Sequence, residues 1–100
     1  MNDLRNSGEG KNMSSRIQLF EMAVKQCDSL LIRFPDRQPI LSIHHQLDYL
    51  LAVTRGEQDS SRLGEIVIGA LTAREVEPLS PEAAKVFYKV AAEARLMQGE

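Results

Sequence analysis

The chain has 100 residues, a mass of 11.2 kDa and a net charge of −2 at pH 7. Hydrophobic residues make up 43% and charged residues 26%, which excludes an intrinsically disordered chain and predicts one soluble domain with a small core. The slightly acidic balance disfavours a dedicated nucleic-acid binder, and no apolar run is long enough to span a bilayer.

The N-terminal stretch differs in composition from the rest of the chain. Residues 1–13 are polar, rich in Gly and Asn, and carry charges that cancel locally. We therefore expect a flexible N-terminal arm over residues 1–13 and a helical domain over residues 14–98. No apolar stretch marks a secretory signal, and the single cysteine, Cys27, excludes an internal disulfide. Both features favour a cytoplasmic protein.

A first helix is predicted from Ser14 or Ser15 to the residue before Pro35, because a residue that precedes proline avoids the α conformation. Its apolar residues recur at spacings of three and four, which places them on one face of a helix. These residues are Ile17, Phe20, Val24, Cys27, Leu31 and Phe34. A stripe of this regularity is also compatible with a homodimer.

A second helix is predicted from Pro39, a residue that suits the first turn of a helix, to Gly56, which tolerates a left-handed conformation. Its apolar stripe follows the same spacings. The stripe comprises Ile40, Ile43, Leu47, Leu50 and Thr54. Because only about four residues join the two helices, we expect them to be antiparallel.

A third helix is predicted to begin at Asp59 or Ser60. Its buried stripe is expected to comprise Leu63, Ile66, Val67, Ala70 and Leu71. Gly64 and Gly69 inside it each lower the stability of the helix by about 1 kcal/mol relative to alanine. A helix tolerates such glycines best where another backbone packs closely. The apolar run 66–68 would also suit a strand, but no second strand exists to pair with it, so helix is preferred.

A fourth helix is predicted to begin with Ser80 as the N-cap, Pro81 in the first helical position and Glu82 in the first turn. It extends to Gly99. Its apolar residues are Ala83, Val86, Phe87, Val90, Ala94 and Met97. The predicted fold class is therefore all-α, a compact bundle of about four helices with a flexible N-terminal arm.

The residues that commonly carry chemistry are few. His44 and His45 are adjacent, so they point about 100° apart on a helix and cannot both bind one metal ion. We expect His44 to be half-buried, His45 to be exposed and Cys27 to be a buried thiol; a nucleophilic Cys/His pair stays open as the alternative. No glycine-rich phosphate loop is present. We therefore predict no catalytic, cofactor-binding or metal-binding residue, and a protein that is not an enzyme.

Acidic residues gather around the third connection. Glu75 and Glu77 precede Pro78, and Glu82 follows in the next helix. This cluster is either a solvent-exposed connection or a surface for a positively charged partner. A helix-turn-helix DNA reader is a weaker alternative, because Arg62 lies among acidic residues that would repel phosphate.

Several short elements occur in a characteristic order at nearly constant spacing. They are Leu31 with Arg33-Phe34-Pro35, Leu41-Ser42, Gln46-Leu47 with Tyr49, Asp59-Ser61-Leu63, Gly69, Ala73-Arg74-Glu75, Glu77 and Pro81-Glu82. With these elements, the stretch from Phe20 to about Arg95 resembles the small helical immunity proteins of type VI secretion. The resemblance is to those that neutralise NAD(P)-hydrolysing effectors delivered into rival bacteria.

The resemblance implies a cytoplasmic protein without a cofactor that binds a toxin's catalytic domain and blocks substrate entry. A pocket that receives the pyrophosphate of NAD should be electropositive, so carboxylates suit the approach to it. The expected toxin-binding residues are Gln46, Tyr49, Glu75, Glu77 and Glu82. Tyr49 is the expected anchor, since aromatic residues dominate binding hot spots; otherwise it is a core tyrosine with a water-facing hydroxyl.

The resemblance gives no role for nucleic acid or membrane. A helical adaptor or regulatory interaction module is the main alternative function, and a DNA-binding regulator is the third.

Overall fold

The computed structural model describes the backbone of residues 3–100 and the side chains from Ser15 onwards. Its α-helices are α1 (Asp3–Arg33), α2 (Gln38–Thr54), α3 (Ile68–Leu71) and α4 (Pro81–Gln98). A 3-10 turn, η1 (Leu63–Glu65), precedes α3, and a π-helical turn, η2 (Thr72–Val76), follows it directly. The predicted all-α bundle is confirmed, and residues 3–100 contain no strand.

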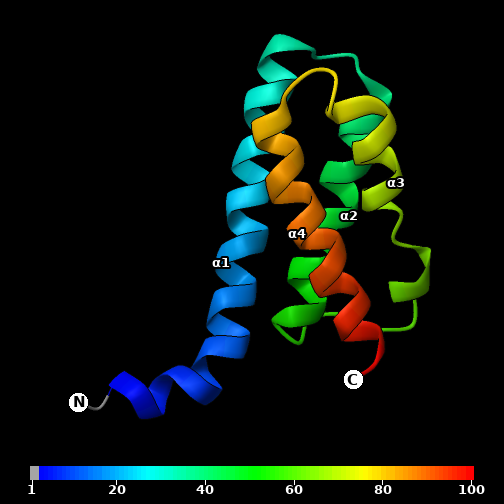
Figure 1. The fold of residues 1–100 in the computed structure, drawn as a ribbon. Helices are drawn as coiled ribbons and strands as arrows, with labels where there is room; N and C mark the ends of the chain where they lie inside the picture. The colour runs from blue at the N-terminus through cyan, green and yellow to red at the C-terminus, as the bar shows by residue number, and fades with distance from the viewer. Residues whose placement is uncertain (1–2) are drawn as a thin grey trace.

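The first two helices, α1 and α2, form an antiparallel pair (Figure 1). The short connection, Phe34 to Arg37, and the proline in the first turn of α2 are as predicted. Gly56 has a φ of +80°, the left-handed conformation expected after the second helix.

The first helix begins earlier than predicted, at Asp3 rather than at Ser14 or Ser15. The flexible arm predicted over residues 1–13 falls on residues whose side chains lie outside the described part of the chain. It therefore stays a prediction.

The predicted third helix is wrong as a continuous element. Ile66 and Val67 interrupt it between η1 and α3, and Gln46 Oε1 accepts a hydrogen bond from the backbone N–H of Val67 at 2.8 Å. This distant side chain satisfies a donor that would otherwise need a helical carbonyl. The buried stripe changes as a result: Ile68 is fully buried, whereas Val67 is 50% exposed and Ala70 is exposed.

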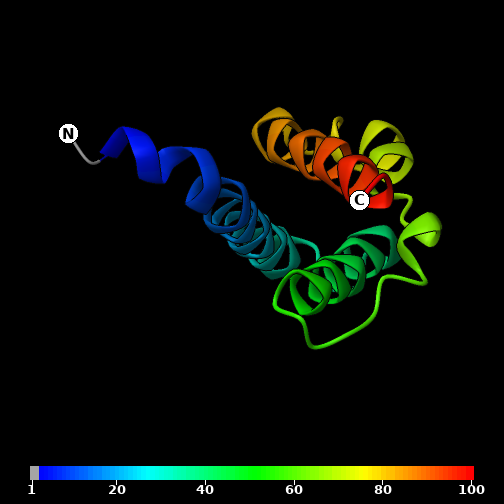
Figure 2. The ribbon, with the colours of Figure 1, turned by 90° about the horizontal axis from the view of Figure 1, so that it is seen from below.

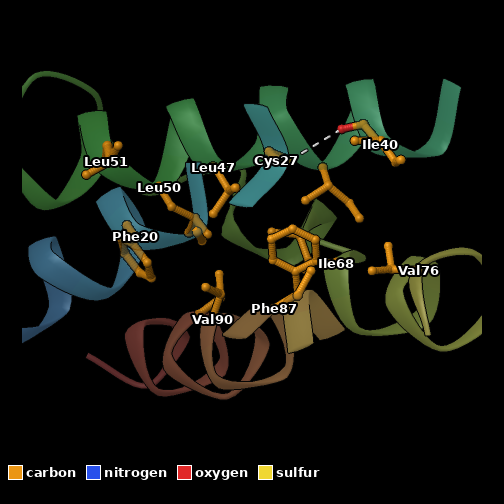
Figure 3. Packing of buried hydrophobic residues seen from close by; sticks show 14 of the residues in the cluster. Phe20, Cys27, Ile40, Leu47, Leu50, Leu51, Ile68, Val76, Phe87 and Val90 are labelled. Atoms are coloured by element: carbon orange, nitrogen blue, oxygen red, sulfur yellow. Dashed lines mark hydrogen bonds between the residues drawn. The ribbon is translucent and has the colours of Figure 1, made fainter. Parts of the chain in front are cut away.

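The fourth helix begins as predicted, because the Ser80 hydroxyl accepts a hydrogen bond from the Ala83 N–H at 3.1 Å. From α4, Phe87 and Val90 point into a core shared with Phe20 of α1 and with α2 (Figure 3). Gly69 of α3 lies against α4: a Cβ at this position would come within 3.4 Å of the Ala91 Cβ. This is an ordinary van der Waals contact with a side chain, and Gly64 is exposed, so neither glycine shows the close backbone packing expected.

An ion-pair cluster joins α1 to the C-terminal end of α4. Arg16 Nε donates to Glu93 Oε1 at 2.9 Å, and Arg16 Nη2 donates to Glu100 Oε2 at 2.9 Å. The hydrogen bond to Glu100 raises the pKa of the Arg16 guanidinium, and the same bond lowers the pKa of the Glu100 carboxyl. The cluster holds together two elements that are far apart in sequence.

Thr72, the first residue of η2, is fully buried, and its hydroxyl has no hydrogen-bond partner within the described part of the chain. Replacing it by valine keeps the shape and removes the desolvated hydroxyl, so Thr72→Val should raise the free energy of unfolding by about 1 kcal/mol. Thr54→Val is the matched control, because Thr54 Oγ1 donates to Leu50 O at 2.8 Å. Urea denaturation measures both; a Thr72→Val variant no more stable than Thr54→Val would contradict the assignment.

Candidate protein-binding surfaces

A groove of about 490 Å³ runs between α2 and the segment 62–67. One wall is the side of α2 from Gln38 to Tyr49, and the other is formed by Arg62, Glu65, Ile66 and Val67. The groove exists because the third segment leaves its helical path at residues 66–67. Its lining combines apolar side chains, among them Leu41, Ile66 and Val67, with polar and charged ones.

Gln46 joins the two walls of the groove. Its Oε1 accepts from the backbone N–H of Val67, and its Nε2 donates to Ser42 Oγ at 3.1 Å. Both ends of the amide are thus engaged within the protein. Gln46, one of the predicted toxin contacts, lines the groove, and its hydrogen bond to Val67 ties the segment 62–67 to α2.

Tyr49 joins the same two elements one turn further along α2. Its hydroxyl donates to Asp59 O at 2.9 Å and accepts from the Arg62 N–H at 3.0 Å. The Arg62 guanidinium lies over the ring at 5.6 Å from its centre. The tyrosine is half-buried, and its hydroxyl is engaged by two backbone groups rather than free to face water. Tyr49 was predicted from the sequence as a contact residue. Arg62 was not, because its position over the ring depends on the path of the loop.

The loop beneath Tyr49 is held by a further local contact. Asp59 Oδ1 accepts from the hydroxyl of Ser61 at 2.6 Å and from its backbone N–H at 3.1 Å. These bonds lower the pKa of the Asp59 carboxyl, because they stabilise its charged form. The predicted start of a helix at Asp59 or Ser60 is therefore a turn closed by an aspartate side chain.

The three glutamates expected to contact a toxin do not line the groove. Glu75 is half-buried in η2, with Oε2 at 4.0 Å from Arg74 Nε, whereas Glu77 and Glu82 are exposed. They lie along the turn that joins η2 to α4, at the top of Figure 1. The structure therefore separates the predicted contact residues into two surfaces, the groove with Gln46 and Tyr49 and this acidic turn.

Glu77 contributes to a raised pKa of Tyr88 on α4. Partial burial raises the pKa of Tyr88, and the negative charge of Glu77 and a hydrogen bond to it act in the same direction. Tyr88 is 37% exposed, so the acidic turn continues into an aromatic surface.

The Cys27 thiol and the two histidines have different partners in the structure. Cys27 is fully buried, and its thiol lies 3.7 Å from the carbonyl oxygen of Ile40. His44 is half-buried as predicted, with Nε2 at 3.2 Å from Asp28 and Nδ1 at 3.3 Å from Asp48. His45 is exposed as predicted and lines the groove. Among the described residues, neither histidine forms a hydrogen bond with the thiol, as a base that activates it would.

Neither a metal site nor a membrane span is visible. Within the described part of the chain, no three His, Cys, Asp or Glu side chains are grouped so that they could hold a metal ion. No helix described in the structure is both long and apolar enough to cross a membrane.

Comparison with known proteins identifies the family. Residues 15–95 match the model of the Tsi6 family. The chain belongs to this family. The resemblance drawn from the short sequence elements between Phe20 and Arg95 is thereby confirmed. No curated protein matches the chain.

Two solved structures have the Tsi6 fold seen in this chain. The structure of Tsi6 from Pseudomonas aeruginosa superposes with a TM-score of 0.75 at 22% identity, covering 79% of this chain and 83% of that one. The structure of Tse6 in complex with Tsi6 contains a chain that superposes with a TM-score of 0.77 at 23% identity, covering 84% of this chain and 92% of that one. The agreement extends over most of both chains.

Proposed function

We propose that this protein is an immunity protein that binds the catalytic domain of a cognate type VI secretion toxin and inhibits it by covering the active site. Membership of the Tsi6 family carries the proposal, since a Tsi6 protein has been solved in complex with Tse6. The toxin is an NAD(P)⁺-hydrolysing or related nucleotide-targeting effector. The immunity protein acts by binding alone, without catalysis or cofactor, in the cytoplasm.

The two surfaces described above supply the proposed contacts. Gln46 and Tyr49 hold a preformed groove, so little ordering is needed when a partner binds there. Glu75, Glu77 and Glu82 present carboxylates that complement the electropositive pocket expected for a nucleotide pyrophosphate. The acidic turn speeds encounter with such a pocket, and the groove gives a shaped contact beside it.

The acidic turn can be tested by charge reversal during co-expression with the toxin. Glu75→Lys together with Glu77→Lys should weaken binding of the toxin at least about tenfold and reduce survival of the cells, because each lysine then faces a positive pocket. Survival of the co-expressing cells and the Kd of the purified pair are the measurements.

A control for charge is available on the same chain. Glu57 is an exposed glutamate in the loop after α2, so Glu57→Lys can be compared directly with Glu77→Lys, which makes the same charge change. Circular dichroism checks that all variants stay helical. Full protection by the double variant would remove the acidic turn from the contact surface, and equal weakening by Glu57→Lys would point to net charge alone.

A further inference from the structure

One long helix face of the bundle is uncovered. α4 contacts α1 along one edge, through Glu93 and Arg16, and α3 along the other, where Gly69 lies against Ala91. α4 lies on the outside of the molecule in both views (Figures 1 and 2). The exposed residues between its two edges are Pro81, Glu82, Lys85, Tyr88, Lys89, Ala92, Arg95 and Leu96.

This exposed α4 face, as we call these eight residues, has an apolar centre. Leu96 is 60% exposed and Tyr88 is 37% exposed, and Ala92 lies between them at a spacing of four. Residues four apart are neighbours along a helix surface, so the three form a continuous strip. Lys85 and Lys89 flank the strip, with Glu82 at one end and Arg95 at the other.

The spacing of the exposed α4 face reads the same from either end. The intervals between successive residues, from Pro81 to Leu96, are one, three, three, one, three, three and one. A second α4 in antiparallel orientation presents the same positions in reverse order. Each exposed residue of one copy then faces an exposed residue of the other around a two-fold axis between Tyr88 and Lys89.

The residues brought together in this way are chemically complementary. Glu82 faces Arg95 of the second copy, and the symmetry repeats this pair at the other end. Pro81 faces Leu96, and Lys85 faces Ala92, which its alkyl stem can cover. At the centre the Lys89 ammonium faces the ring of Tyr88, a cation–π arrangement. No two like charges are directly opposed.

The charged residues at the two ends of the exposed α4 face, Glu82 and Arg95, are available for these contacts. Neither Glu82 nor Arg95 belongs to an ion pair among residues 15–100. The antiparallel orientation also places the positive N-terminal end of each α4 beside the negative C-terminal end of the other. On the regular apolar stripe of the first helix, Phe20 and Cys27 are fully buried, and the other members pack against the core of the same chain.

We infer that two copies of this chain associate through the exposed α4 face as a two-fold symmetric dimer with antiparallel α4 helices. A single pair of helices buries less than the roughly 800 Å² per partner of a standard interface. The dimer is therefore weak, with a Kd on the order of 10–100 μM. Glu82 also belongs to the proposed toxin contacts, so the toxin and the second copy compete for it.

Analytical ultracentrifugation of the full chain without toxin tests the inference independently of the proposed function. Between about 5 and about 500 μM the mass should rise from 11.2 kDa towards twice that value. Glu82→Arg and Arg95→Glu should each weaken association at least about tenfold, because each places two like-charged pairs at the interface. The two changes combined restore opposite charges and should return the Kd to within about threefold of the original.

Glu57→Arg, in an exposed loop away from α4, should leave the Kd unchanged. Circular dichroism confirms folding of each variant before the measurement. A monomer over the whole concentration range would overturn the inference. So would a double variant that associates as weakly as the single variants, because the opposed pair of Glu82 and Arg95 would then play no part.

Discussion

Phe87→Ala should lower the free energy of unfolding by about 3–5 kcal/mol, the usual cost of removing a buried phenylalanine. Phe87 is fully buried, with an exposed fraction of 0%. It points from α4 into the core shared with α1 and α2 (Figure 3). Removing the ring leaves a cavity where three elements meet. Since small domains are stable by about 5–15 kcal/mol, urea denaturation should show a large loss of stability.

Two further variants make this result interpretable. Met22→Ala removes a large apolar side chain that is 50% exposed on α1, and should cost less than about 1 kcal/mol. Phe87→Leu keeps part of the buried volume and should cost roughly half as much as Phe87→Ala or less, so it reports on the site even if the alanine variant is unfolded. Equal costs for Met22→Ala and Phe87→Ala would contradict the described core.

The Cys27 thiol should react with Ellman's reagent at pH 8 at least about a thousandfold more slowly in the folded protein than in the unfolded chain. Burial, with smaller effects of the Asp28 and Asp48 charges, raises the pKa of the thiol from 9.0 to about 12. At pH 8 this lowers the thiolate fraction from about one tenth to about one ten-thousandth, and the thiolate is the reactive form. Labelling with and without urea measures the ratio.

The same pKa shift has a consequence for stability. Above about pH 9 the unfolded chain loses the thiol proton while the folded chain keeps it, so the free energy of unfolding falls as the pH rises towards 12. Cys27→Ala should reduce this part of the pH dependence. Rapid labelling of folded protein would instead show an accessible thiol and restore the nucleophilic alternative considered from the sequence.

The regular helices could be predicted from sequence because their signals are local. The spacing of apolar residues in α1, α2 and α4, the proline in the first turn of α2 and the Ser80 cap all act within a few residues. The break in the third segment could not be predicted in this way. It depends on a hydrogen bond from Val67 to Gln46, a residue on another helix, which only the folded arrangement brings into reach.

The sequence suggested the residues of the candidate surfaces but not how they are arranged in space. Tyr49 and Gln46 stood out through the family resemblance and the value of aromatic anchors, yet their backbone contacts and the groove follow from the broken third segment. Arg62 was considered only as a weak DNA contact, and its position over the Tyr49 ring was missed. The acidic residues were found from their clustering around Pro78 in the sequence, while their separation from the groove needed the fold.

Inhibition of the toxin through binding can be measured by titrating the purified chain into the catalytic domain of the toxin encoded beside it while NAD(P)⁺ hydrolysis is followed. Hydrolysis should cease at equimolar amounts with a Kd of about 1 nM or lower, equivalent to about −12 kcal/mol, and the chain alone should leave NAD(P)⁺ intact. Undiminished hydrolysis in the presence of excess chain would contradict the account.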